Sequence, residues 1–185
     1  MSIQKVLVYL GATMPADASY AEAVRELGEG LVRQGRTLVF GGSREGTMTI
    51  LADAVLKNGG KAIGVFTKAL PPDLLYPGLT QTIITENILE RKEEMFRQAD
   101  AIIAMPGSFG TWDELFDALE RLKIDKIHRR PLKPLAVLNL HGYYDSVLAL
   151  LQRSVQEGYT QPHYAQLLHA ASSVEELLEW LDTKE

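Results

Sequence analysis

The sequence of 185 residues contains no cysteine. This absence excludes a disulfide framework, a thiolate nucleophile, and zinc or iron–sulfur sites with cysteine ligands. Basic residues are the scarcer charged class, with 19 Lys and Arg against 24 Asp and Glu, and the net charge of −5 disfavours binding to nucleic acid. The 4 histidines form no i, i+4 pair, so we expect no metal site.

Long hydrophobic runs are also missing. No apolar stretch approaches the roughly 20 residues that cross a bilayer, so we expect no membrane association. Met1 is followed by a strand-like run rather than by the apolar region of a signal peptide, so we expect a cytoplasmic protein. Hydrophobic residues nevertheless make up 46% of the sequence, which is enough for the core of one globular domain over residues 1–185.

Apolar runs of strand length alternate with segments of helical periodicity along the whole chain. Most of these runs are continuously apolar, which is typical of parallel strands covered by helices on both faces. We predict strands over residues 6–10, 37–40, 61–66, 81–85, 101–105 and 135–140. We predict helices over residues 18–34, 47–57, 88–98, 111–122, 143–156 and 174–182. This order predicts an α/β fold, a Rossmann-like doubly wound parallel sheet in a single domain.

Three predicted strands end in glycine-containing loops, at Gly11, at Gly41 and Gly42, and at Gly107 and Gly110. Sheets of this type bind ligands at the carboxyl ends of their strands. Without a Cβ, backbone N–H groups can converge on an anion, and the following helix N-terminus favours negative charge. Glycine also occurs in tight turns that bind nothing, but three such loops together favour a phosphate-bearing ligand. None of them matches a Walker loop or Gly-x-Gly-x-x-Gly, which disfavours ATP hydrolysis and dinucleotide redox chemistry.

Charged side chains lie close to the apolar faces of two predicted helices. Helical periodicity places Lys92 within the apolar face of the third helix and Arg91 at its edge. Their stems could cover the sheet edge while their charged groups reach water, or the two cations could face a ligand. Glu114 has a capping-box spacing to Thr111, yet its place beside a buried face also suits a site residue, whereas Asp113 points to solvent.

Ser108 lies in a segment that partly matches the nucleophile elbow Gly-x-Ser-x-Gly, although Pro106 replaces the first glycine. Asp125 and His141 follow in an order that a serine hydrolase allows. A serine hydrolase is therefore one alternative for this sequence.

Two segments, Glu90 to Lys92 and Ala99 to Glu114, resemble the signature of the LONELY GUY (LOG) family, which is Arg-Lys followed by Pro-Gly-Gly-x-Gly-Thr-x-x-Glu. The similarity extends to Gly41-Gly42 and to Leu138–Tyr144, and so covers nearly the whole chain. Members are phosphoribohydrolases, which release the free base and ribose 5-phosphate from cytokinin riboside 5′-monophosphates and often from AMP. Many once carried the name lysine decarboxylase, but nothing in this sequence identifies a Schiff-base lysine for pyridoxal phosphate, and we expect no cofactor.

The resemblance implies that Arg91 and Glu114 form the catalytic pair and that the Gly107 to Thr111 loop holds the 5′-phosphate. It also implies a homodimer with sites near the subunit interface. A carboxylate suits this reaction because cleavage of an N-glycosidic bond builds positive charge on the ribose, and a forked arginine suits phosphate or ribose oxygens. The residues that we predict to bind substrate are Gly11, Thr13, Gly41, Gly42, Lys92, Pro106, Gly107, Ser108, Gly110 and Thr111.

Ser43 and Ser108 stand where the family pattern has glycine. A Cβ at either position narrows the approach of a phosphate, although a serine hydroxyl can also donate a hydrogen bond to it. These two residues favour an alternative function, a non-catalytic carrier of a nucleotide or cofactor with the same fold.

Overall fold

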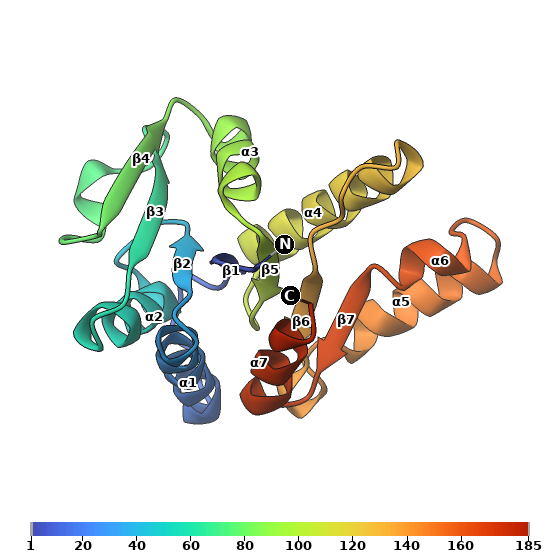
Figure 1. Ribbon diagram of the computed structural model, residues 1–185, viewed down its shortest axis with the longest axis horizontal. Coiled ribbons are helices and arrows are strands. Elements are labelled where there is room, and N and C mark those ends of the chain that lie inside the picture. The colour runs from blue at the N-terminus through green and yellow to red at the C-terminus, as the bar shows by residue number, and fades with distance from the viewer. Residues whose placement is uncertain (1, 185) are drawn as a thin grey trace.

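The computed structural model describes residues 2–184 and contains a seven-stranded sheet in the order β4-β3-β2-β1-β5-β6-β7, with helices on both faces (Figure 1). The strands are β1 (Lys5–Tyr9), β2 (Thr37–Phe40), β3 (Ala62–Thr67), β4 (Gln81–Thr85), β5 (Ala101–Ala104), β6 (Leu135–Leu138) and β7 (Leu168–Ala171). The helices are α1 (Ala18–Arg33), α2 (Gly46–Lys57), α3 (Ile88–Gln98), α4 (Phe109–Ile127), α5 (Asp145–Gln156), α6 (Pro162–Ala165) and α7 (Val174–Asp182), with 3-10 turns η1 (Pro72–Leu74) and η2 (Leu140–Gly142).

The direction in which the chain fills the sheet reverses beside β1. After β1 the chain adds β2, β3 and β4 on one side, and it then returns to place β5, β6 and β7 on the other. All six neighbouring pairs are parallel. Such a switch point leaves a crevice at the carboxyl ends of the central strands. The predicted α/β fold with a doubly wound parallel sheet is confirmed.

The core consists of two apolar clusters, one on each face of the sheet. One cluster includes residues of α1, α2 and α7, and the other includes residues of α3, α4 and α5. Val6 and Val8 of β1 belong to the first cluster, whereas Leu7 and Tyr9 belong to the second. Because successive side chains of a strand point to opposite faces, burial on both sides requires the continuous apolar runs found in the sequence.

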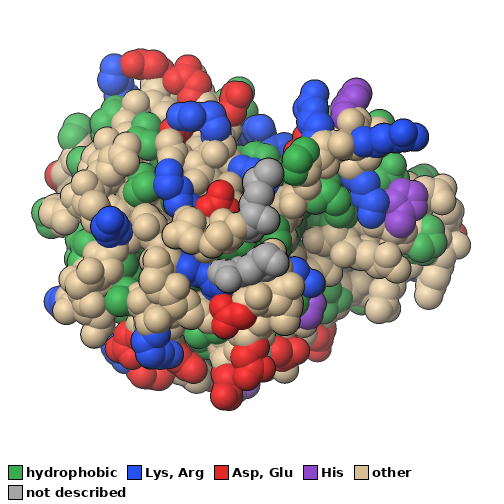
Figure 2. Space-filling model, viewed as in Figure 1, with side chains coloured by type: hydrophobic (Ala, Val, Ile, Leu, Met, Phe, Trp, Pro, Cys, Tyr) green, Lys and Arg blue, Asp and Glu red, His purple; other side chains and the backbone are tan. Residues whose placement is uncertain are grey.

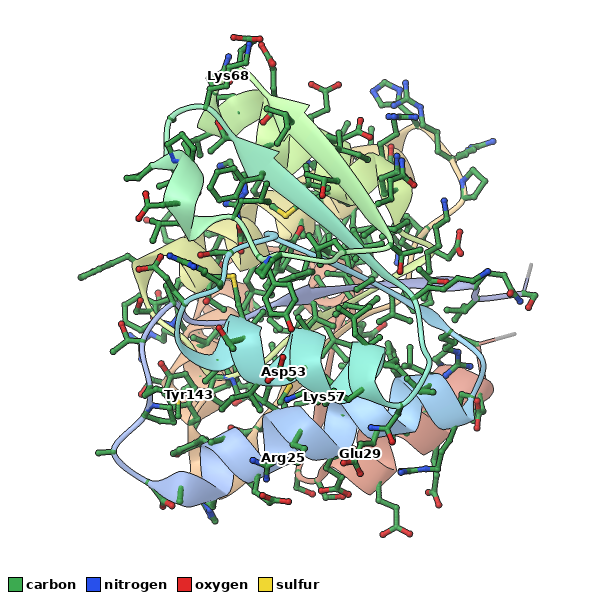
Figure 3. All side chains as sticks on the ribbon, turned by 90° about the vertical axis from the view of Figure 1, so that its left-hand side faces the viewer. Arg25, Glu29, Asp53, Lys57, Lys68 and Tyr143 are labelled. Carbon is green, nitrogen blue, oxygen red and sulfur yellow. The ribbon has the colours of Figure 1, made fainter. Side chains whose placement is uncertain are left out.

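Helices α1 and α2 pack closely against each other at Gly28, where a Cβ would lie only 2.7 Å from a side-chain carbon of α2. Figure 3 shows Arg25 and Glu29 of α1 on the side of that helix that faces Asp53 and Lys57 of α2. The Lys57 Nζ donates to Asp53 Oδ2 at 2.9 Å within α2. Charged side chains thus border the apolar contact between α1 and α2. This contact fixes α2 and the loop that precedes it.

The structure corrects several predicted boundaries and adds one strand, one short α-helix and the 3-10 turns. Helix α4 begins at Phe109 and ends at Ile127, so it extends beyond the predicted span of 111–122 at both ends. Strand β6 ends at Leu138, and a 3-10 turn separates it from α5. Strand β7 and the short helix α6 were not predicted. The β7 sequence contains no β-branched residue, so its strand conformation results from pairing with β6 rather than from intrinsic propensity.

The surface carries mixed charge. Figure 2 shows acidic and basic side chains interspersed over the face that it draws, and acidic side chains gather along its lower edge, where α1 and α7 lie in Figure 1. Within residues 2–184, no helix combines the length and the apolar character that a membrane span requires.

Candidate active site

A cavity of about 200 Å³ opens at the carboxyl ends of the central strands. It lies between the loops that follow β1, β2 and β5, which is where the topology predicts a ligand site. We call it the strand-end cavity. Its lining residues are Val8, Leu10, Gly11, Ala12, Gly41, Ser43, Glu45, Met48, Leu70, Arg91, Ser108, Gly110, Thr111 and Glu114.

The N-terminus of α4 forms one wall of the strand-end cavity. Ser108 is the N-cap residue, but its hydroxyl makes no capping hydrogen bond, so the first-turn N–H groups stay available to a ligand. The Thr111 hydroxyl is buried and has no hydrogen-bond partner among the described residues. A Cβ on Gly107 would overlap the Thr111 side chain, so this loop requires glycine there. This wall thus presents unpaired donors, an arrangement that suits an anionic oxygen.

Two tyrosines that follow β6 brace the same loop. The Tyr144 hydroxyl donates to the Met105 carbonyl at 2.7 Å, and the Tyr143 hydroxyl donates to the Gly107 carbonyl. Tyr144 is fully buried. The loop is therefore held in place before any ligand arrives.

Arg91 lies in the first turn of α3, which begins after the N-cap residue Asn87. Its Nε donates to the Val65 carbonyl and its Nη2 donates to the Gly41 carbonyl, both at 2.9 Å. A Cβ on Gly41 would overlap the guanidinium, so glycine at this position is what lets Arg91 approach the end of β2. The guanidinium is thus fixed against β3 and the end of β2, and the Arg91 side chain is only 12% exposed.

Glu114 faces the Arg91 guanidinium across the strand-end cavity, with 3.5 Å between Oε1 and Nη1. Burial raises the pKa of Glu114 to about 7, against the opposing effect of the Arg91 charge, and Asp113 raises it further. The alternative of a capping role is wrong, because α4 begins before Thr111 and the Trp112 N–H already bonds to the Ser108 carbonyl. Glu114 is therefore a largely buried carboxyl group in a cavity, and its pKa is raised to about 7.

Lys92 lies outside the strand-end cavity, although it was predicted to bind substrate. Its Nζ is 3.0 Å from Asp113 and 3.7 Å from Asp117, so it links α3 to α4. Asp113 is 57% exposed, in agreement with its predicted orientation towards solvent. Gly42 does not line the cavity either. It has a φ of +72° and lies against the Gly64 backbone, so its role is to turn the chain after β2.

A second cavity of about 240 Å³ adjoins the first, and both are lined by Gly11 and Ser108. We call it the apolar cavity. The rings of Tyr20 and Tyr143, whose centroids are 6.0 Å apart, form part of its wall. The predicted binding residues Thr13, Pro106 and Gly107 line this cavity rather than the first. Its full lining is Gly11, Thr13, Met14, Pro15, Tyr20, Val24, Thr47, Pro106, Gly107, Ser108 and Tyr143.

Glu45, Met48 and Leu70 in the strand-end cavity, and Tyr143 beside the loop between β5 and α4, were not predicted from the sequence. Glu45 had a signal, since it is an acidic residue between the glycines of a strand-end loop. Met48 and Leu70 had none, because apolar residues in a helix or a loop give no sign of lining a site.

The residues of the serine-hydrolase alternative are not assembled. His141 Nε2 bonds to the Ser19 hydroxyl at 3.0 Å, and Asp125 pairs with Arg130 at 3.3 Å. Among the described residues, no histidine bonds to Ser108. That alternative is therefore contradicted by the geometry. Within residues 2–184, no group of three or more histidine and acidic side chains is placed to hold a metal ion.

Fold and site together define the class of this protein, a Rossmann-like α/β protein with a preorganised polar site at the strand ends. Residues 48–181 match the family model described as possible lysine decarboxylase. The chain is 36% identical to the probable cytokinin riboside 5′-monophosphate phosphoribohydrolase LOGL5 of Oryza sativa subsp. japonica, over 95% of this chain and 70% of that protein. It is 34% identical to the cytokinin riboside 5′-monophosphate phosphoribohydrolase LOG7 of Arabidopsis thaliana, over 98% and 82%. The chain therefore belongs to the LOG family, to which the possible-lysine-decarboxylase model corresponds.

Solved structures share the fold at lower identity. The molybdenum cofactor binding protein from Rippkaea orientalis superposes with a TM-score of 0.73 at 20% identity, covering 100% of this chain and 98% of that one. At this identity the likeness concerns the fold alone.

The decarboxylase description implies pyridoxal phosphate, which needs a lysine for its Schiff base. Among the described residues, neither the strand-end cavity nor the apolar cavity is lined by a lysine. The nearby Lys92 Nζ is engaged by two carboxylates of α4. These residues do not fit pyridoxal phosphate.

Proposed function

We propose that this protein hydrolyses the N-glycosidic bond of nucleoside 5′-monophosphates, cytokinin riboside 5′-monophosphates or AMP, to a free base and ribose 5-phosphate. The observation that carries the proposal is the Arg91–Glu114 pair, 3.5 Å apart, in a cavity beside the N-terminus of α4. The names of the curated relatives support the same reaction.

The 5′-phosphate binds at the N-terminus of α4. The first-turn N–H groups of that helix, together with the unpartnered Thr111 hydroxyl, supply hydrogen-bond donors, and the helix dipole favours negative charge. The Ser108 hydroxyl adds a donor where the family pattern has none. Phosphate at this wall leaves the ribose beside Glu114 and Arg91.

Glu114 lies beside C1′, the ribose carbon at which the bond to the base breaks. As the C1′–N bond breaks, positive charge develops on the ribose, and the carboxylate stabilises it while it removes a proton from the attacking water. The hydroxide adds to C1′, and the proton ends on the departing base. A pKa of about 7 gives Glu114 a substantial carboxylate fraction at neutral pH together with a useful basicity.

Arg91 is positioned by main-chain carbonyls rather than by substrate. Two of its nitrogens bond to Val65 and Gly41, and its Nη1 faces Glu114. Its remaining N–H groups are available to phosphate or ribose oxygens. The same guanidinium therefore favours the ionised form of Glu114 and holds the substrate.

The active form is a homodimer with its sites near the interface. Helix α4 presents an exposed apolar face that starts next to the loop between β5 and α4, and Phe109 on it is 82% exposed. Trp112 and Phe116 lie on the same face of α4 and are also exposed. Leu89 of α3 is 73% exposed. Exposed apolar residues that gather on one helix face are typical of a protein interface.

Chromatographic product analysis tests the proposed reaction directly. The purified protein is incubated with AMP and with an N6-modified analogue, and adenine or the modified base is expected with the wild type but not with Glu114→Ala. If the protein binds AMP in a thermal-shift assay yet releases no base, while a known family enzyme does so under the same conditions, it is a carrier. Ser43 and Ser108 are the residues that favour that second function.

A further inference from the structure

Glu45 is a second carboxylate in the strand-end cavity, and the reaction described above does not use it. It immediately precedes α2 at the N-cap position, but its side chain makes no capping hydrogen bond. Among residues 2–184, the Ser43 hydroxyl donates a hydrogen bond to Glu45, with 3.3 Å between Oγ and Oε2. No lysine or arginine side chain of these residues forms an ion pair with Glu45. An acceptor without a cationic partner thus lies in the wall of the cavity.

The loop that carries Glu45 is fixed on both sides. The Thr47 hydroxyl donates to the Gly11 carbonyl at 2.7 Å, which ties the start of α2 to the loop after β1. The Arg44 N–H donates to the Leu74 carbonyl at 2.8 Å, which ties the loop to η1. Glu45 is therefore held on a rigid backbone, as a recognition residue requires.

Among the parts of the proposed substrate, the ribose offers such a group a vicinal pair of hydroxyl donors, whereas the base offers an amino group alone. A phosphate carries negative charge and repels a carboxylate, and it has its own donors at the N-terminus of α4. A ribose ring offers two vicinal hydroxyl donors, which a carboxylate accepts well because it has only acceptor sites. Acidic side chains recognise ribose hydroxyls in this way in other parallel α/β sheets.

We propose that Glu45 accepts hydrogen bonds from the ribose 2′- and 3′-hydroxyls and thereby selects ribonucleotides over deoxyribonucleotides. This inference rests on the proposed function. The Ser43 hydroxyl occupies one Glu45 oxygen and orients the carboxylate, so Ser43, which stands in place of a family glycine, acts as a positioning residue. Glu45 is a specificity-determining residue rather than part of the proton-transfer machinery.

The experiment is a thermodynamic cycle between the Glu45 side chain and each of the two ribose hydroxyls. The kcat/KM is measured for wild type and Glu45→Gln with AMP, 2′-deoxy-AMP and 3′-deoxy-AMP. Because the amide keeps the size of the side chain, folding is preserved, and Glu45→Ala serves as a second variant. Glu93→Gln, an exposed residue of α3, is the control for the loss of one negative charge. The cycle cancels the intrinsic difference in reactivity between ribosyl and deoxyribosyl bonds.

Hydrogen bonds to a charged group predict a loss of about 10- to 100-fold for Glu45→Gln with AMP. The same variant is expected to lose less with each deoxynucleotide than with AMP, because one of the two hydroxyls that Glu45 bonds is already absent from it. Equal losses with all three substrates, or no loss, would overturn the inference. A result in which Glu93→Gln behaves like Glu45→Gln would do so as well, since it would indicate a general charge effect.

Failure of the proposed function gives a different result. If wild-type protein releases no base from any substrate, the same cycle is measured as dissociation constants by calorimetry, with AMP and the two deoxynucleotides. Coupling between Glu45 and a hydroxyl in binding supports the inference for a carrier. The absence of coupling, or of any binding, rejects it.

Discussion

Glu114 is the residue on which the chemistry depends most directly, because its carboxyl group is buried beside a fixed arginine. Replacement by glutamine keeps the shape but removes the charge and the proton acceptor. We expect Glu114→Gln to lower kcat for AMP about 100-fold or more, since both the electrostatic and the general-base contributions are lost. Base release is the measurement, and unchanged binding of AMP by calorimetry shows that the site is intact. A variant with near wild-type turnover contradicts the proposed role.

The raised pKa of Glu114 predicts the pH dependence. Burial favours the protonated form, so the carboxylate that the reaction needs forms only as the pH rises through about 7. We expect kcat/KM for AMP to increase through that region and then level off. The substrate phosphate also titrates, near pH 6, but its effect persists in the residual activity of Glu114→Gln, whereas the step near 7 disappears. A profile that falls through this region indicates an acid role instead.

The raised pKa also means that the ionised form of Glu114 destabilises the native state. A folded-state pKa above the usual value means that the native state binds a proton more tightly than the unfolded chain, so stability falls as the pH rises from about 4.5 through 7. We expect Glu114→Gln to stabilise the fold by on the order of 1 to 3 kcal/mol at about pH 8. Thermal unfolding at two pH values tests this, because the gain should shrink towards pH 5. A destabilised variant at pH 8 contradicts it.

At the scale of elements, the loop between β5 and α4 is the feature that positions the site. A Cβ on Gly107 would overlap Thr111, whereas a Cβ on Gly110 meets no atom within 4 Å. We expect Gly107→Ala to lower the melting temperature and Gly110→Ala, in the first helical turn, to leave it unchanged or raise it slightly, because alanine is the better helix former. Calorimetric unfolding of the two matched variants is the measurement. Equal destabilisation would mean that the loop, rather than the Thr111 contact, requires glycine.

Some of the helices and strands could be predicted from the sequence, and others could not. The strands β2 and β4 and the helices α3 and α7 were predicted with the bounds that the structure has, because runs of apolar or β-branched residues and a clear helical period define them. Strand β7 was not predicted, since its propensity is weak and its pairing with β6 forms only in the sheet. The start of α4 was placed late because Thr111 and Glu114 have the spacing of a cap that the chain does not use.

At the scale of the whole molecule, the exposed apolar face of α4 is the surface through which we expect two chains to pair. A dimer that buries this face should be disrupted by a charge placed within it, so we expect Phe116→Arg to shift the protein from dimer to monomer. Ile84→Arg, on the exposed side of edge strand β4, should leave the oligomeric state unchanged. Light scattering coupled to size exclusion measures both. A wild-type monomer, or a Phe116→Arg dimer, rejects the proposed interface, and activity of the monomeric variant shows whether each site is complete in one chain.

The sequence by itself determined the class of fold and the glycine loops at the strand ends, because burial on both faces and sharp strand-to-helix turns each leave a local pattern. It also carried the Arg91 and Glu114 motif. Only the tertiary structure decided which charged groups meet, since Lys92 and Arg91 are neighbours in the chain but lie in different surroundings. Arg91 reaches the cavity because Gly41 leaves room for it, whereas Lys92 meets the carboxylates of α4. The cavity joins residues far apart in the sequence, and the switch of strand order beside β1 is what brings them together.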